Sequence, residues 1–144
     1  VISSNLQESQ QAVDLVSRYR REINTPEACE LYCTAGVHPH HADGFCADGF
    51  KERDANKLAQ LLQQDEVVAV GECGLDFNRN FSTQANQLRA FELQLELAQD
   101  TTKPLYLHER DAFAAQIALL KRYISDKTQA IAHCFTGTHF VSTN

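Results

Sequence analysis

Four residues that can bind a metal ion or transfer a proton each stand directly after a short apolar run. Their intervals of 34, 36 and 25 residues are close to one strand–helix unit of a (β/α) barrel, in which about 250 residues make eight units. Because parallel strands end at the same rim of a barrel, side chains that follow them gather at that rim. A cation held there activates water, which is the chemistry of a metallohydrolase. The four residues are His38, Glu72, His108 and His133.

Two carboxylates occupy one short segment after the second apolar run. Glu72 follows Gly71 directly, and Asp76 comes four residues later. Carboxylates held this close repel each other unless a cation lies between them. We therefore expect Glu72 to be a metal ligand that also serves catalysis, and we assign Asp76 to catalysis beside it.

The histidines divide into expected ligands and expected rim residues. His108 and His133 are expected to complete the metal site, because imidazole is a good ligand for zinc, manganese and iron-like cations. His38 begins a segment with Pro39 in which three of four residues are histidines, and these cannot all face one ion from so short a loop. We assign His38 to catalysis, in contact with a substrate phosphate or a metal-bound water. His40 is assigned to substrate binding, with a solvent-exposed position as the alternative.

Arg110 follows His108 by two residues. Its guanidinium is a planar, bidentate donor suited to phosphate, so we assign it to substrate binding. A surface ion pair with Glu109 or Asp111 is the alternative. Asp111 itself is expected to cap the helix that follows.

Apolar periodicity divides the chain into alternating helices and strands. Helices are expected over residues 5–21, 50–64, 82–99 and 111–124, and strands over 31–37, 67–70, 104–107 and 129–132. Residues 1–5 resemble the end of a further strand. Regular alternation indicates a parallel sheet with right-handed crossovers. An open doubly wound sheet is the alternative, but the chain lacks the Gly-rich phosphate loop that such a sheet usually carries.

The composition is that of an ordinary globular domain, with 144 residues, 43% hydrophobic and 22% charged. No segment approaches the roughly 20 apolar residues needed to span a bilayer, so we expect no membrane contact. The net charge of −6 argues against a protein that coats nucleic acid with a basic surface, although bound cations supply positive charge locally. Five cysteines without a Cys-x-x-Cys pair indicate reduced thiols in a cytoplasmic protein.

Four segments of the chain, taken in order, resemble the TatD family of metal-dependent deoxyribonucleases, and residues 71–83 are especially similar to bacterial members. We interpret residues 1–144 as a single domain, the central part of a barrel that lacks its N- and C-terminal units. The four segments are Gly36–His40, Val68–Asp76, Pro104–Ala112 and His133–Gly137.

The resemblance implies a (β/α)8 TIM barrel of the amidohydrolase-like type, incomplete here with about five βα units. It implies a cytoplasmic hydrolase that cleaves phosphodiester bonds in DNA, as a 3′–5′ exonuclease that prefers single strands. The cation would be magnesium, with manganese or zinc as alternatives, and Glu72, His108 and His133 correspond to family metal ligands. The family's first-strand H-x-H pair and its late aspartate have no counterpart in this chain. The intact protein is expected to be a monomer.

Two other functions stay open at this point. A related barrel metallohydrolase would act on an ester, a lactone or an amide instead of DNA. An inactive, truncated fragment would keep only part of the ligand set and would bind a cation weakly.

Overall fold

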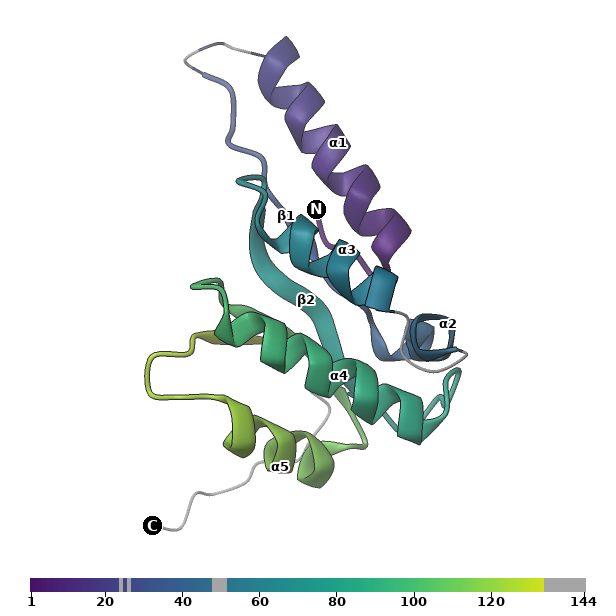
Figure 1. Ribbon diagram of the computed structural model, residues 1–144. Helices are drawn as coiled ribbons and strands as arrows, with labels where there is room; N and C mark the ends of the chain where they lie inside the picture. Colours follow the sequence, from purple (N-terminus) through teal and green to yellow (C-terminus); the bar gives the residue numbers. More distant parts are fainter. Residues whose placement is uncertain (24, 26, 48–51, 134–144) are drawn as a thin grey trace.

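The computed structural model describes residues 1–144 except 24, 26, 48–51 and 134–144 (Figure 1). Its described strands form one parallel sheet in the order β1-β2-β3-β4, which is also their order in the chain. Such an order is that of a (β/α) barrel, since a doubly wound sheet reverses its strand order at a switch point. The strands are β1 (Cys33–Ala35), β2 (Val67–Asp76), β3 (Leu105–Arg110) and β4 (Ala130–His133).

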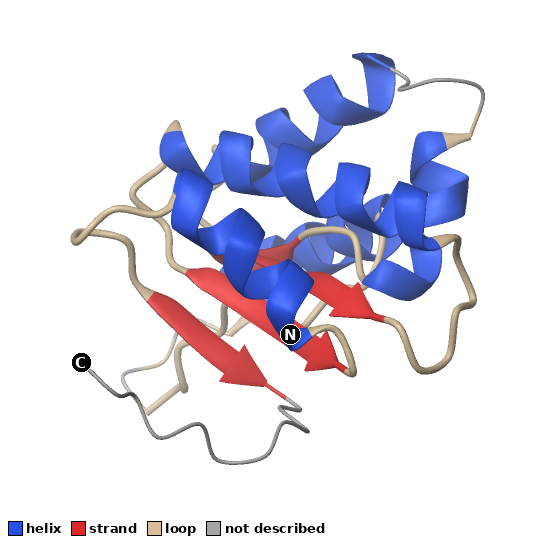
Figure 2. Cartoon of the chain, turned by 90° about the horizontal axis from the view of Figure 1, so that it is seen from below, coloured by secondary structure: helices blue, strands red, loops and turns tan. Residues whose placement is uncertain are grey.

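The helices gather on one face of the sheet, as Figure 2 shows; α1 precedes β1, and the other helices connect consecutive strands. The sequence predicted four of them with small errors at their ends, whereas the short α2 and the 3-10 turn before it were not expected. Part of the helix predicted over 50–64 lies outside the described residues. The helical segments are α1 (Leu6–Glu22), η1 (Pro39–His41), α2 (Ala42–Cys46), α3 (Glu52–Leu62), α4 (Gln84–Gln99) and α5 (Phe113–Tyr123).

The N-terminal segment is not a strand, so the described sheet has four strands and not the predicted five. It runs beside β1 instead: the Thr34 N–H donates to Val1 O at 2.9 Å, and Ser3 Oγ donates to Thr34 O at 2.9 Å. The predicted fold class is nevertheless confirmed, because the alternating helices and parallel strands make an incomplete α/β barrel. That residues 1–144 form a single domain stays a prediction.

Side chains cap α1 and α4, whereas the cap predicted at Asp111 is wrong. Asn5 Oδ1 accepts the Glu8 N–H at 2.9 Å, and Thr83 caps α4. Asp111, predicted to cap α5, has a φ of +51°, and its carboxylate accepts a bond from Asn78 Nδ2 at 2.6 Å. The N-cap residue of α5 is Ala112, which makes no side-chain cap, and the Glu109 carboxylate accepts its N–H at 2.9 Å.

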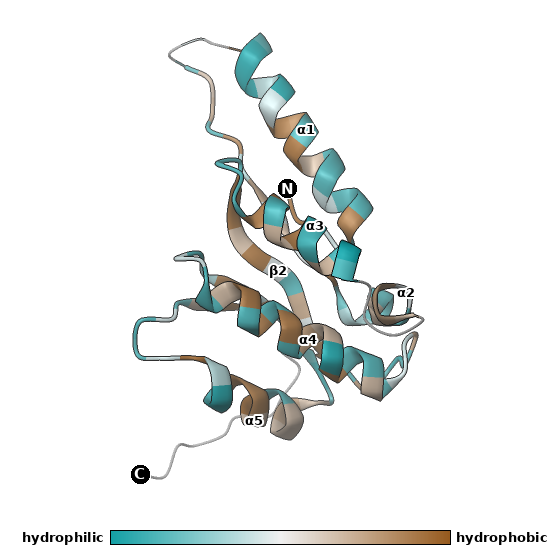
Figure 3. Cartoon of the chain, in the orientation of Figure 1, coloured by the Kyte–Doolittle hydropathy of each residue, from teal (hydrophilic) through white to brown (hydrophobic). Residues whose placement is uncertain are grey.

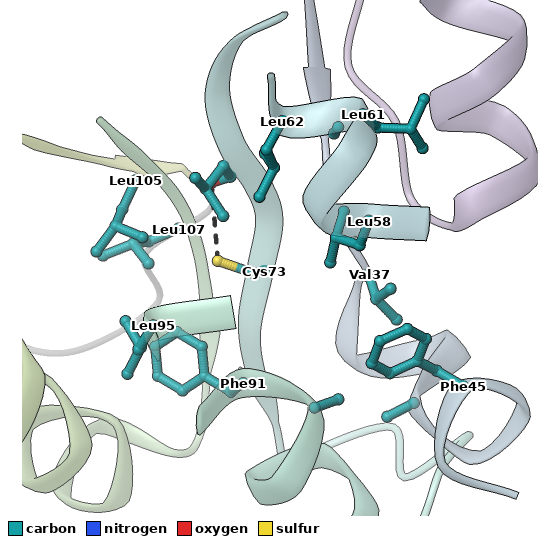
Figure 4. Packing of buried hydrophobic residues seen from close by; sticks show 14 of the residues in the cluster. Val37, Phe45, Leu58, Leu61, Leu62, Cys73, Phe91, Leu95, Leu105 and Leu107 are labelled. Carbon is teal, nitrogen blue, oxygen red and sulfur yellow. Dashed lines mark hydrogen bonds between the residues drawn. The ribbon is translucent and has the colours of Figure 1, made fainter. Parts of the chain in front are cut away.

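The hydrophobic core lies between the sheet and the helices. Figure 4 shows Phe91 and Leu95 of α4 near Leu105 of β3, and all three are fully buried. Figure 3 shows that α1 carries mainly hydrophilic residues, and only one face of this helix is buried. In the part of the chain that the structure describes, every helix is too short or too polar to cross a membrane.

Buried glutamines complete the hydrogen bonding where strands end. Gln94 is fully buried, and its amide accepts the Val37 N–H at 2.7 Å and donates to Val37 O at 3.0 Å. Gln87 makes the same pair of bonds with the backbone of Asp76, both at 2.9 Å. Because an unpaired backbone group is costly in the core, these amides fix the chain beside His38 and at Asp76.

We expect Gln94→Leu to lower the free energy of unfolding by about 3 kcal/mol, because it leaves the N–H and C=O of Val37 buried without partners. Urea unfolding followed by circular dichroism measures the change. Gln84→Leu is the matched control, since Gln84 is exposed at the start of the same helix. Equal stability of the two variants would contradict the role given to the Gln94 amide.

Candidate active site

Three of the predicted site residues come together at the carboxyl ends of adjacent strands. His38 follows β1, Glu72 lies in β2 and His108 lies in β3. One ligand-type atom from each lies within 4.8 Å of the others. Glu72 Oε1 is 3.1 Å from His108 Nδ1 and 3.8 Å from His38 Nε2. A carboxylate and two imidazoles at this spacing are a donor set suited to one divalent cation.

A bulge in β2 places Glu72. Opposite β3, Gly71 pairs with Tyr106 and Cys73 pairs with Leu107, so Glu72 has no partner there. Its N–H donates instead to Ser3 O at 3.1 Å. Bulges commonly redirect a side chain beside an active site. The sequence predicted that this strand ends at Val70, and the structure extends it to Asp76.

Two glycines in β2 let the strand backbones approach each other closely. Gly71 has a φ of +139° and Gly74 a φ of +136°, conformations that other residues rarely adopt. A Cβ on Gly71 would overlap the carbonyl oxygen of Tyr106, and one on Gly74 would overlap that of His108. The site therefore depends on the absence of side chains at both positions.

We expect Gly71→Ala to lower the free energy of unfolding by about 3 kcal/mol or more, from backbone strain and overlap with β3. Gly44→Ala is the control. Gly44 lies in α2, and a Cβ added to it would meet no atom within 4 Å. Urea unfolding of both variants makes the comparison. A Gly71→Ala protein as stable as Gly44→Ala would show that the close approach is not required.

Asp76 and His40 form a second pair next to these residues. His40 Nε2 lies 2.7 Å from Asp76 Oδ2, and the Asp76 side chain is 1% exposed. The His40 backbone N–H donates to His38 Nδ1 at 3.1 Å. The ring and backbone of His40 thus link Asp76 to His38.

The electrostatics of the cluster keep both acids ionised. A hydrogen bond from His108 lowers the pKa of Glu72, against the opposing effect of burial. Burial alone would raise the pKa of Asp76, but hydrogen bonds from the Arg79 N–H and from His40 hold it at about 2. Burial, and secondarily the neighbouring His108, lowers the pKa of His38 to about 4, so this ring is neutral at pH 7.

His133 lies on the strand next to His108 but outside the three-residue cluster. It pairs with His108 in the register of β3 and β4. Its ring stacks on Tyr106, with centroids 5.4 Å apart, and the residue is exposed. The nearby imidazole contributes to the lowered pKa of Glu72. The rest of its sequence motif, from Cys134 onward, lies outside the described residues.

Arg110 lies on the same face of β3 as His108, because side chains two residues apart in a strand point the same way. Within the described residues, neither of the acids considered as ion-pair partners binds it. Asp111 bonds to Asn78, and Glu109 accepts the Ala112 N–H at 2.9 Å. Among the described residues, the guanidinium is therefore held by neither of these two acids.

The model of the family described as TatD related DNase matches residues 1–142. The chain belongs to this family. Among its TatD relatives, the "3′-5′ ssDNA/RNA exonuclease TatD" of Edwardsiella piscicida is 49% identical over 138 residues, and that of Escherichia coli K12 is 43% identical over 138 residues. Each alignment covers 96% of this chain and 48% of the relative, so the chain spans about half the length of the relatives it matches.

Solved TatD structures resemble the fold over the same extent. The hydrolase TatD family protein of Entamoeba histolytica superimposes with a TM-score of 0.79 at 28% identity, covering 96% of this chain and 44% of that one. The TatD homologue YJJV of Escherichia coli K12 superimposes with a TM-score of 0.73 at 27% identity, covering 96% and 48%. The incomplete barrel of this chain thus corresponds to about half of a TatD barrel.

Sequence reasoning missed two features of this TatD site. The first is the support from buried glutamines, because nothing in the sequence distinguishes Gln87 and Gln94 from surface glutamines. The second is the burial of Glu109, which is 4% exposed and accepts the Ala112 N–H just before α5. The strand alternation offered a signal for Glu109, since it shares the core-facing parity of Leu105 and Leu107.

Proposed function

We propose that this chain carries the cation-binding and phosphate-binding residues of a TatD-type hydrolase that cleaves phosphodiester bonds in DNA. The substrate is single-stranded and is degraded from its 3′ end, in keeping with the names of the relatives. The observation that carries the proposal is the convergence of Glu72, His38 and His108 within 4.8 Å at the strand ends. In this group Glu72 and His108 suit a divalent cation as ligands, and His38 lies beside them.

Glu72 and His108 Nδ1 are the proposed cation ligands, and His133 is the third. The position of His133 beside His108 in the register, and its effect on the pKa of Glu72, support this assignment. A bound divalent cation lowers the pKa of a water molecule and polarises a phosphoryl oxygen. Magnesium as the cation, a monomeric state and a cytoplasmic location stay predictions.

His38 acts as a hydrogen-bond donor rather than a ligand. Its Nδ1 accepts the His40 N–H at 3.1 Å. A neutral imidazole that accepts at one nitrogen carries its proton on the other, so Nε2–H points into the site. This proton stabilises the negative charge that develops on the phosphate as the bond breaks. Arg110, on the same face of β3, holds the phosphate in a fixed orientation.

We expect Glu72→Gln and His108→Ala to abolish cleavage of 3′-labelled single-stranded DNA and to weaken Mn²⁺ binding, because each removes a ligand. Gel analysis of the products and titration of Mn²⁺ measure the two effects. Glu66→Gln is the control, since Glu66 lies directly before the first residue of β2, at the opposite end of the strand from Asp76. Unchanged turnover in either site variant would refute the proposal. Cleavage of small esters or amides in place of DNA would identify a different barrel hydrolase.

We expect His38→Asn to lower turnover about a hundredfold, the usual cost of losing one donor to a developing negative charge. Asparagine can still accept the His40 N–H, but it lacks a donor at the position of Nε2. Mn²⁺ affinity is expected to stay at the wild-type value. A loss of affinity as large as that of Glu72→Gln would instead make His38 a ligand.

A further inference from the structure

Asp76 occupies the centre of the hydrogen bonding behind the proposed cation site. Its Oδ1 accepts the backbone N–H groups of Asn78 at 3.1 Å and Arg79 at 2.9 Å. Its Oδ2 lies 2.7 Å from His40 Nε2 and 3.5 Å from His108 Nε2. Both oxygens are therefore engaged, and Asp76 lies outside the group of residues whose atoms converge for a cation.

His108 lies between the two carboxylates. Its Nδ1 faces Glu72 Oε1 at 3.1 Å, and its Nε2 faces Asp76. Within the described residues, Nε2 is buried and makes no hydrogen bond of normal length. A buried imidazole N–H costs free energy unless it is paired, and Asp76 Oδ2 is the acceptor at hand. A contraction of a few tenths of an ångström completes that bond.

His40 extends the same network to His38. Its ring packs edge-on against the rings of His38, 4.4 Å away, and Phe81, 4.8 Å away. Its Nε2 meets Asp76 while its backbone N–H holds His38 Nδ1. Asp76 thus contacts the His108 imidazole directly and is linked to the His38 imidazole through His40.

We propose that Asp76 and His40 are positioning residues, and that neither ligates the cation nor binds substrate. Without a cation, His108 Nδ1–H donates to Glu72. With a cation bound, the imidazole would carry its proton on Nε2, where Asp76 accepts it, and the Nδ1 lone pair would be directed beside Glu72. Imidazoles that bind metals generally donate their other N–H to a carboxylate or carbonyl in this way. The inference rests on the proposed function, and it reassigns Asp76 from catalysis and His40 from substrate contact.

The decisive variant is Asp76→Asn, which keeps Oδ1 for the Asn78 and Arg79 N–H groups and removes the charge facing the imidazoles. We expect Mn²⁺ to bind about 10- to 100-fold more weakly, the usual effect of losing such a partner. Glu109→Gln is the matched control, because Glu109 is also a buried carboxylate that accepts a backbone N–H, yet it pairs with neither imidazole. Its Mn²⁺ affinity is expected to equal that of the wild type.

Two variants of His40 separate positioning from simple packing. His40→Gln can still donate to Asp76 and should keep the wild-type Mn²⁺ affinity, whereas His40→Leu should lose part of it. If circular dichroism shows that Asp76→Asn does not fold, the Mn²⁺ affinities of the two His40 variants test the positioning role instead. Wild-type affinity in a folded Asp76→Asn protein, or equal affinities in His40→Gln and His40→Leu, would overturn the inference.

The ¹⁵N signals of the imidazole rings separate failure of this inference from failure of the proposed function. If the wild-type chain binds no Mn²⁺, the proposed cation site is wrong for this chain. The ring signals still test the positioning role, because Asp76→Asn should shift the His108 Nε2 signal and Glu109→Gln should not. An unchanged His108 spectrum in Asp76→Asn would refute contact between these residues.

Discussion

The backbones of three neighbouring strands approach one another at the rim more closely than side chains would permit. A Cβ on Gly36 would lie 2.5 Å from the Cα of Gly71, and one on Gly71 or Gly74 would overlap a carbonyl of β3. This approach draws together the backbone segments that carry His38, Glu72 and His108. The donor atoms of His38, Glu72 and His108 converge because the strand backbones pack closely. The proposed cation site therefore depends on this strand packing as well as on the ligands themselves.

Charge in the site is arranged so that acids and imidazoles alternate. Glu72 lies against His38 and His108, and Asp76 lies against His108 and His40. With His38 neutral and both acids ionised, the cluster favours a cation over an anion. The whole chain has a net charge of −6, so the proposed nucleic-acid substrate would depend on local positive charge from the proposed cation and Arg110.

The sequence located the strands because each apolar run is followed by a residue that can bind a metal or transfer a proton, and the alternation of elements predicted the sheet order. It ended β2 six residues too early, at Val70 instead of Asp76. It could not supply the bulge at Glu72, because a polar residue between glycines reads as the end of a strand. Nor could the spacing of the strands show that the His133 ring stacks on Tyr106 and lies outside the cluster of His38, Glu72 and His108. Contacts of Asp76, His40 and Glu109 depend on distances between segments that no local pattern encodes.

The two buried glutamines of α4 give that helix a further property. They are seven residues apart, about 10 Å along the axis or close to two turns, so both amides lie on the same side. One reaches the chain beside His38 and the other reaches Asp76. The helix therefore fixes the distance between the segment after β1 and the end of β2. Inserting or deleting one residue between them would rotate one amide by about 100°, so evolution can vary the outer surface of α4 but not its length here.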